Sequence, residues 1–317
     1  MKKFLYLFLL LFSLNSFAQN TIEDYQRIFL PVYTIVGDLK IAIRVFKING
    51  TPSFLTVNPK TLDTEILPIA SLRPRQLTPQ KKKPGYFTFW NIASTPYYQI
   101  LNKNTAEPYV MENQGLKHVD LDEGNILTVD LCPSSKPFEA DFFKALVKRA
   151  DELHKPTPLV IAVSGMWIIG HPDEFQWLIS QEKQHKLDIT WANHSFSHVY
   201  YNDLPYADNF LLRPETNFDL EILQTEKYLL EAGEMPSIFF RFPGLISNPA
   251  LIKKLKSFGL IPLGTDAWIA NLKRNRQEVM PGGIILVHGN SNEHKGIVLI
   301  KPLLDKLDFK NIKNALL

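Results

Sequence analysis

The sequence predicts an α/β protein in which helices cover a parallel β-sheet, preceded by a smaller β-rich N-terminal region. From Ile126 onward, short apolar runs alternate with segments whose apolar residues recur at helical spacing, and repeated strand–helix units of this kind are typical of parallel sheets. Before about His118, the chain consists mainly of extended runs and turns. The periodicity alone does not distinguish a doubly wound sheet from a barrel.

Residues 1–18 have the pattern of a secretory signal peptide. Lys2 and Lys3 precede an apolar core, residues 4–12, and the small-residue sequence Ser-Phe-Ala precedes Gln19. This core is too short to cross a bilayer comfortably. We therefore expect a mature protein that is secreted or periplasmic and has no stable membrane span. Its single cysteine excludes an internal disulfide, so its stability must come from packing.

Residues 19–118 form the predicted β-rich region. The run Leu39–Ile48 alternates branched apolar residues with others, and Asn49-Gly50 separates it from a second extended run, Ser53–Val57. An Asn-Gly pair accepts the positive φ angles of a tight turn, so we predict a β-hairpin. We expect this region to pack as a sheet against the rest of the chain, with sugar binding as the alternative.

A proline-rich stretch at about residues 74–85 contains a dense basic run, Lys81 to Lys83. We interpret this stretch as a solvated linker, and a docking patch for an acidic polymer is the alternative. The net charge of +3 is too small, and the lysines are too scattered, to indicate a nucleic-acid partner. The remaining residues, 119–317, form the predicted second domain.

The second domain contains the alternating elements. Its first helix is predicted from the apolar face that Phe142, Leu146 and Ala150 form at helical spacing. The predicted strands are Ile126–Val129, Leu159–Val163, Leu187–Ala192, Ile238–Phe240, Leu260–Leu263 and Ile284–Val287. The predicted helices are Phe138–Leu153, Pro172–Gln184, Glu215–Ala232, Pro249–Phe258 and one that begins near Ile297.

Charged side chains stand at the ends of three of these strands. Asp130 ends the first strand, Arg241 ends the strand after the long helix, and His288 ends the last strand. Because the carboxyl ends of parallel strands gather active-site residues, we expect these side chains to come together. Each also has an ordinary alternative: Asp130 as a cap of a helix or turn, Arg241 as a partner of a surface carboxylate, and His288 as a buried histidine.

The sequence NHSFSH, residues 193–198, follows another predicted strand and places His194 and His198 four positions apart. On a helical turn, side chains at this spacing lie on one face with Cβ atoms about 5–6 Å apart, so the two imidazoles could bind one divalent metal ion. The alternative is a chance spacing of two solvated histidines. A zinc protease is disfavoured, because no glutamate follows His194 as in the H-E-x-x-H pattern.

The ordered sequences TVDLCPS, NHSFSH, RFPG, TDAW and ILVHG resemble the polysaccharide deacetylases, the NodB-homology group of carbohydrate esterases. The resemblance extends from about Asn125 to Leu307. It implies an irregular (β/α) barrel, usually with fewer than eight strands. It also implies a metal-dependent hydrolase that removes acetyl or other acyl groups from N-acylated sugars of a polysaccharide or cell-envelope glycan. That glycan would be the partner, and the sequence does not indicate an oligomeric state.

The resemblance assigns roles to the residues already singled out. His194 and His198 would bind a divalent metal ion, either zinc or else cobalt or nickel. Asp130 would act as the catalytic base, and His288 would protonate the leaving amine. Arg241 would orient Asp130 and keep it ionised.

Three further residues receive roles from the same resemblance. The backbone N–H of Gly244, which stands where the family has tyrosine, would donate to the oxyanion. Asp266 would tune His288, and Trp268 would line the sugar-binding groove. The TDAW segment that contains both residues is shorter than the family's pattern.

The first motif departs from the family, which has two adjacent aspartates there. The first corresponds to Asp130, whereas the second, a metal ligand, corresponds to Leu131. Leucine cannot bind a metal, so we expect Leu131→Asp to restore a ligand. Two alternatives remain open: a Cys132 thiolate that binds zinc in place of a simply buried cysteine, and an Asp130 that itself turns to the metal. The departure makes a catalytically impaired, glycan-binding pseudoenzyme the alternative function.

Overall fold

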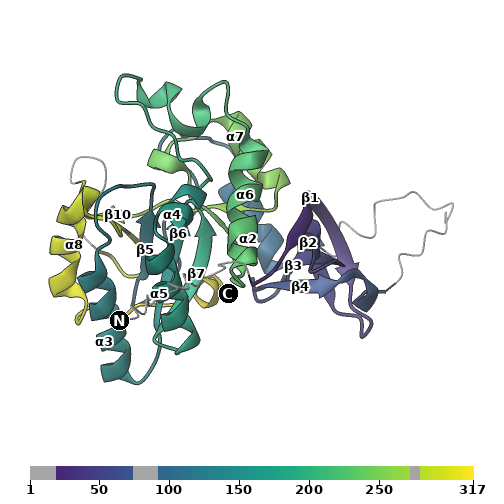
Figure 1. The fold of residues 1–317 in the computed structure, drawn as a ribbon, viewed down its shortest axis with the longest axis horizontal. Coiled ribbons are helices and arrows are strands. Elements are labelled where there is room, and N and C mark those ends of the chain that lie inside the picture. The colour runs from purple at the N-terminus through teal and green to yellow at the C-terminus, as the bar shows by residue number, and fades with distance from the viewer. Residues whose placement is uncertain (1–18, 74–91, 272–278) are drawn as a thin grey trace, which may run out of the picture.

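The computed structural model describes residues 19–73, 92–271 and 279–317. The described chain forms a four-stranded antiparallel sheet followed by a seven-stranded parallel sheet with helices around it (Figure 1). The mixed α/β class and the β-rich N-terminal region are thereby confirmed. The predicted signal peptide and the predicted linker lie outside the described residues, and the boundary near residue 118 stays a prediction.

The N-terminal sheet is an antiparallel meander. Its strands, in spatial order, are β1 (Ile22–Tyr33), β2 (Leu39–Ile48), β3 (Thr51–Val57) and β4 (Thr64–Pro68). Asn49 and Gly50 join β2 to β3 with φ angles of 50° and 78°, which confirms the predicted turn. β1 is largely exposed or half-buried along its length. It therefore lacks the alternation of buried and exposed positions from which a strand is predicted.

The second sheet consists of β5 (Ile126–Leu131), β6 (Thr157–Val163), β7 (Leu187–Asn193), β8 (Pro236–Phe240), β9 (Ile261–Pro262), β10 (Ala267–Trp268) and β11 (Ile284–His288). The spatial order is β10-β11-β5-β6-β7-β8-β9, and all neighbouring pairs are parallel. β5 and β8 are buried along their whole length, as expected for strands covered on both faces. The sheet is a curled half-barrel and not a closed one, because the described strands β9 and β10 end the order and do not pair with each other.

Helices precede, connect and follow the parallel strands. They are α2 (Pro96–Asn104), α3 (Ala140–Leu153), α4 (Gly165–Gly170), α5 (Pro172–Lys183), α6 (Phe218–Glu231), α7 (Pro249–Ser257), α8 (His294–Ile300) and α9 (Ile312–Ala315). Side-chain caps fix where several of them begin. The side chain of Asn217 accepts a hydrogen bond from the backbone N–H of Leu220, so α6 begins at Phe218 and not at the predicted Glu215.

Alternate residues of the parallel strands enter two different layers. Val129 and Leu131 of β5 are fully buried in a cluster with apolar residues of α3, α4 and α5. Asp130, between them, faces the opposite side, because successive side chains of a strand alternate. A second apolar cluster contains residues of both sheets, among them Ile41 of β2 and Ile238 of β8. The two sheets therefore share a core.

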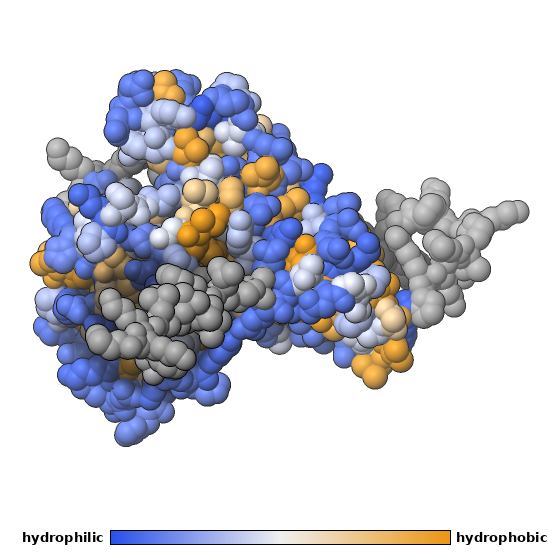
Figure 2. Space-filling view, viewed as in Figure 1, coloured by the Kyte–Doolittle hydropathy of each residue, from blue (hydrophilic) through white to orange (hydrophobic). Residues whose placement is uncertain are grey.

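Polar residues predominate on the face of the molecule that Figure 2 shows, and apolar residues gather in small patches. Among the described residues, the turn between β1 and β2 carries the most exposed large apolar side chains, Ile35 and Val36, which are 65% and 82% exposed. In the part of the chain that the structure describes, no helix combines the length and the apolar character of a membrane span.

Candidate active site

The carboxyl ends of four parallel strands meet at one pocket. Asp130 of β5 pairs in register with His288 of β11, while His194 follows β7 and Arg241 follows β8. The pocket has a volume of about 440 Å³, and Asp130, His194 and His288 line it. The structure thus brings together the charged side chains that the sequence places at strand ends.

His194 and His198 lie in a loop after β7 and not on a helical turn. Ser195 and His198 have positive φ angles of 66° and 48°, and residues 194–200 contain no helical residue. The two rings nevertheless meet, with centroids 4.6 Å apart. The two imidazoles are therefore close together, as expected. Residues in left-handed backbone conformations bring them together, and not the periodicity of a helix.

Two buried side chains accept hydrogen bonds from the backbone of this loop and fix its conformation. The side-chain oxygen of Asn193 accepts a hydrogen bond from the backbone N–H of Ser195 at 2.9 Å. Glu221 of α6, which is only 6% exposed, accepts hydrogen bonds from the backbone N–H groups of Phe196 and Ser197 at 2.9 and 2.8 Å. It also accepts one from the Ser197 hydroxyl at 2.5 Å. A charged helix residue is usually solvated, so nothing in the local sequence indicates this role of Glu221.

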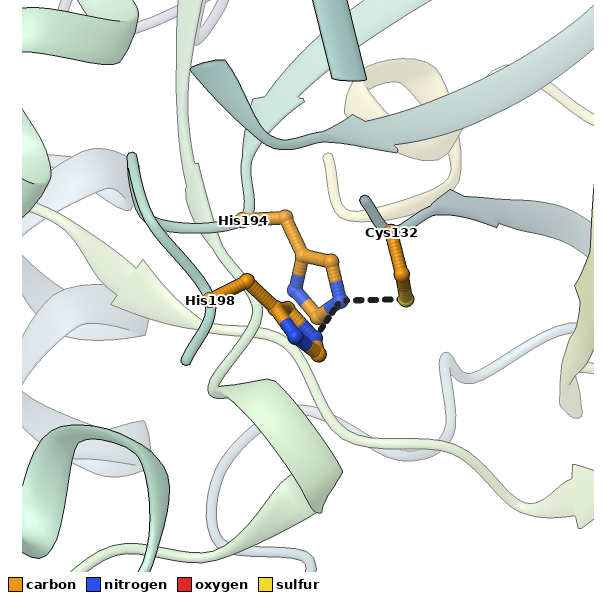
Figure 3. A group of neighbouring side chains, drawn as sticks. All are labelled: Cys132, His194 and His198. Carbon is orange, nitrogen blue, oxygen red and sulfur yellow. Dashed lines mark hydrogen bonds between the residues drawn. The ribbon is translucent and has the colours of Figure 1, made fainter. Parts of the chain in front are cut away.

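The histidine nitrogens face a third potential ligand. Nδ1 of His194 lies 2.9 Å from the carbonyl oxygen of Arg241. Because a carbonyl only accepts, this nitrogen carries the proton and Nε2 has a free lone pair. That Nε2 lies 3.1 Å from Nε2 of His198 and 3.4 Å from Sγ of Cys132 (Figure 3). All three potential ligand atoms lie within 4.8 Å of one another, a donor set that fits a divalent metal ion.

Asp130 and Arg241 form a buried ion pair beside these nitrogens. Nη1 of Arg241 donates to Oδ1 of Asp130 at 2.9 Å, and the two side chains are 0% and 4% exposed. Nη2 of Arg241 donates to the carbonyl oxygen of Gly264 at 3.1 Å. The other carboxylate oxygen, Oδ2, lies 3.7 Å from Nε2 of His194. One oxygen of Asp130 is therefore fixed by the guanidinium, and the other faces the histidines.

His288 also contacts a carboxylate, which belongs to Glu293 and not to Asp266 as expected. Nδ1 of His288 lies 2.5 Å from Oε2 of Glu293, and Nε1 of Trp268 donates to the same oxygen at 2.8 Å. Oδ2 of Asp266 lies 3.1 Å from Nδ1 of His118 instead. Asp266 precedes β10 and so lies toward the amino ends of the parallel strands, whereas Trp268 ends β10 and lines the pocket.

Leu131 and Cys132 lie on opposite sides at the end of β5. Leu131 is fully buried in the apolar cluster under the helices. Its Cδ2 would lie only 2.5 Å from a Cβ added to Gly289, so the space around it is filled. Cys132 lines the pocket. The position expected to be a vacant ligand site is therefore part of the core, and the side chain that reaches the histidines is the thiol of the next residue.

Aromatic rings form another wall of the pocket. Phe210 stacks on Tyr200 with centroids 5.0 Å apart, and it meets the ring of His198 edge-on at 5.3 Å. Gly244 has a left-handed φ of 62°, and a Cβ at this residue would meet Cε2 of Phe210 at 2.5 Å. The left-handed conformation thus favours glycine here, and a larger residue would require the ring of Phe210 to shift.

Burial and neighbouring groups shift the pKa of three pocket residues. Burial lowers the pKa of His194, against the opposing charge of a nearby carboxylate. Burial acts in the same direction on His288, but hydrogen bonding with Cys132 and Glu293 outweighs it and raises the pKa well above its usual value. For the Cys132 thiol, burial raises the pKa, but the charges and hydrogen bonds of His198 and His288 lower it to about 7.

Comparison with known proteins gives one partial family match and several solved structures with partial similarity. Residues 23–98 match the family described as RP012 protein N-terminal domain. A family 4 carbohydrate esterase from Bacillus anthracis is 19% identical with a TM-score of 0.46, over 71% of this chain and 94% of that chain.

PdaA from Bacillus subtilis, also a family 4 carbohydrate esterase, is 19% identical with a TM-score of 0.45, over 63% of this chain and 84% of that chain. BA3943, a pseudoenzyme of the same family from Bacillus anthracis, is 13% identical with a TM-score of 0.43, over 63% of this chain and 68% of that chain.

Proposed function

We propose that the protein is an exported, metal-dependent hydrolase that removes acetyl or other acyl groups from N-acylated sugars of a polysaccharide or cell-envelope glycan. Hydrolysis of an amide requires a positive centre for the carbonyl oxygen, a base for the attacking water and an acid for the leaving amine. The single observation that carries the proposal is that one pocket contains groups suited to all three tasks. The signal-peptide pattern of residues 1–18 supports export.

His194 and His198 would hold the metal ion through their Nε2 atoms. The backbone carbonyl that accepts from Nδ1 of His194 fixes the tautomer with a free lone pair on Nε2, as it does for many metal-binding histidines. When bound, a divalent metal ion lowers the pKa of water and polarises the acyl oxygen. Imidazole ligands suit zinc best among the common ions, and they also suit cobalt and nickel.

Asp130 would accept the proton of the attacking water. Arg241 holds Oδ1 of Asp130 at 2.9 Å, which leaves Oδ2 turned toward the histidines. A neighbouring guanidinium favours the ionised form of a carboxyl group. Because both partners are buried, the orientation of the carboxylate is also fixed by packing.

His288 would complete the reaction as the acid for the leaving amine. As the acyl carbon–nitrogen bond breaks, His288 donates a proton to the amine nitrogen, and the products are a carboxylate and a free amino sugar. The carboxylate of Glu293, 2.5 Å from Nδ1, would form an ion pair with the protonated imidazole. The backbone N–H of Gly244, which lines the pocket, can donate to the acyl oxygen as negative charge develops on it.

The pocket walls fit a sugar. Trp268, Tyr200 and Phe210 all line the pocket, and the flat apolar faces of aromatic rings match the C–H face of a pyranose. The indole of Trp268 is fixed by its hydrogen bond to Glu293 at 2.8 Å. A sugar stacked on this ring would therefore lie next to His288, the group that must reach its amine.

Asp130→Asn tests the proposal directly. We expect turnover of N-acetyl oligosaccharides and of a simple acetyl ester to fall by about two orders of magnitude or more, because the amide keeps the volume of the side chain but cannot accept a proton. The bound metal, measured by elemental analysis, should stay unchanged. Asp266→Asn is the matched control, since it makes the same chemical change outside the pocket and should retain activity.

Three outcomes would contradict this account in different ways. Full activity of Asp130→Asn would remove Asp130 from the mechanism. Loss of metal in parallel with activity would show that Asp130 is itself a ligand. A wild-type protein that binds metal and N-acetyl oligosaccharides but hydrolyses neither amide nor ester would be a glycan-binding pseudoenzyme.

A further inference from the structure

We infer that the thiolate of Cys132 is the third protein ligand of this metal, so that the chain builds a Cys-His-His site. The assignment rests on the metal ion of the proposed function. It goes beyond that function because it adds a sulfur ligand, which is inferred from the position of the Cys132 side chain. The sulfur lies 3.4 Å from Nε2 of His194, which in turn lies 3.1 Å from Nε2 of His198.

These separations fit a tetrahedral metal site. Zinc binds thiolate sulfur at about 2.3 Å and imidazole nitrogen at about 2.0 Å, and tetrahedral angles then place sulfur and nitrogen about 3.5 Å apart and two nitrogens about 3.3 Å apart. The observed distances of 3.4 and 3.1 Å are close to both values. Two of the three separations thus match a tetrahedral site, and all three ligand atoms lie within 4.8 Å of one another.

The direction of the chain at the end of β5 explains why the sulfur takes this position. Leu131 packs in the apolar core and has no exposed surface. The side chains on either side of it, Asp130 and Cys132, face the pocket. Asp130 is already held by Arg241 through one oxygen. Its other oxygen, Oδ2, lies 3.7 Å from Nε2 of His194, whereas the sulfur of Cys132 lies 3.4 Å from the same nitrogen. We therefore assign the metal to the thiolate and keep Oδ2 of Asp130 for its role as base.

A sulfur ligand predicts which ions the site selects. Thiolates favour soft and borderline ions such as zinc, cobalt(II) and cadmium, whereas magnesium and manganese(II) prefer oxygen ligands. One thiolate and two neutral imidazoles also leave a net charge of one on the bound divalent ion. Open positions for water and substrate remain, as in catalytic zinc sites with three protein ligands.

Cobalt(II) substitution tests the ligand without relying on activity. The mature chain loaded with one equivalent of cobalt should show a thiolate-to-cobalt charge-transfer band in the near ultraviolet. Cys132→Ser should abolish this band while His194 and His198 still bind the ion. The zinc affinity of this variant, measured in a competition titration, should be lower than that of the wild type by a factor of ten or more. Asn292→Ala, a change of another residue that lines the pocket, should keep both the band and the affinity. Circular dichroism of the metal-free variants checks that each one folds.

The outcomes separate this inference from the proposed function. Metal binding that depends on His194 and His198, without a charge-transfer band in the wild type or with equal zinc affinity in Cys132→Ser, overturns the sulfur ligand and leaves the hydrolase proposal standing. A cysteine-dependent band in a protein without turnover supports the ligand and contradicts the hydrolase. A wild-type chain that binds neither zinc nor cobalt overturns both.

Discussion

At the scale of single residues, Leu131 shows that adjacent residues of a strand can lie in different environments. Its side chain is in the apolar core, whereas those of Asp130 and Cys132 line the pocket. The sequence places a leucine where a ligand is expected, and the structure shows that this leucine has no exposed surface. Its neighbours in the cluster include Val129, Phe143 and Val163. A carboxylate introduced there would face these apolar side chains and not the histidines.

We therefore predict that Leu131→Asp destabilises the protein and gains no metal affinity. Burying a carboxylate without a partner costs several kcal/mol and raises the pKa of the group instead of producing a ligand. Urea unfolding should show a large loss of stability, and zinc titration of the folded fraction should give an affinity no higher than that of the wild type. This reverses the expectation drawn from the sequence.

Leu131→Met is the matched control, because it conserves volume and apolar character and should cost less than about 1.5 kcal/mol. A tenfold or larger gain in zinc affinity for Leu131→Asp would show that position 131 can reach the histidines after all. In that case the end of β5 must turn differently when metal is bound.

The residues of the candidate site differ in how far the sequence could reveal them. Asp130, Arg241 and His288 are predictable, because each stands at the end of an apolar run and parallel strands bring such ends together. Glu293 and Glu221 are not. Each is a carboxylate on or near a helix, where solvent exposure is the usual state, and only the packing of distant segments shows what it touches.

At the scale of elements, strands and helices with strong apolar periodicity are predicted within a few residues of their observed ends. β2 has the predicted bounds, and α3 carries the predicted apolar face. The errors have local physical causes. Caps displace helix starts, β1 has no clear alternation, and β10 is only two residues long. The backbone path of the loop after β7 does not follow from the helical spacing of its histidines, because two non-glycine residues in left-handed conformations determine it.

The contact between α6 and this loop leads to a prediction about Glu221. We expect Glu221→Ala to lower zinc affinity about tenfold or more, because the backbone N–H groups of Phe196 and Ser197 lose their acceptor and the loop that carries the histidines is no longer fixed. Excess metal should restore the activity, since the side chain touches neither metal nor substrate. Zinc competition titration and metal-dependent turnover measure the two effects.

Asn217→Ala is the control for this variant. It removes the cap of the same helix, which costs about 1 kcal/mol of stability, but it does not touch the histidine loop. Its zinc affinity should equal that of the wild type. If both variants lose affinity equally, the effect comes from general loosening of α6, and Glu221 has no special role in positioning the histidines.

At the scale of the whole molecule, the N-terminal sheet is joined to the parallel sheet by a buried ion pair as well as by a common apolar core. Arg44 of β2 contacts Glu226 of α6 through two nitrogens, at 2.6 and 2.7 Å. The third guanidinium nitrogen donates to the carbonyl oxygen of Phe258 at 2.7 Å, and the hydroxyl of Tyr25 donates to Glu226 at 2.9 Å. Every charged atom of the pair thus has a partner.

Because the two side chains are only 0% and 1% exposed, removing one partner should cost far more than removing both. We predict that Glu226→Leu lowers the free energy of unfolding by about 3–5 kcal/mol, since it leaves the Arg44 charge buried and unpaired. The double variant Arg44→Met with Glu226→Leu should recover most of that loss, because apolar side chains of similar volume replace the pair. Urea unfolding of both variants and the wild type gives the comparison.

The same pair predicts where the molecule opens first. In Glu226→Leu, amide hydrogen exchange should quicken in β1 and β2 more than in β5, because the variant weakens the contact of the N-terminal sheet with α6 and leaves the parallel sheet intact. Glu152→Gln, which removes an exposed pair with Lys148 within α3, should change neither stability nor exchange. Equal exchange in both sheets would show that they unfold as one cooperative unit. A double variant that is no more stable than Glu226→Leu would show that the ion pair itself stabilises the junction, and not merely the avoidance of an unpaired charge.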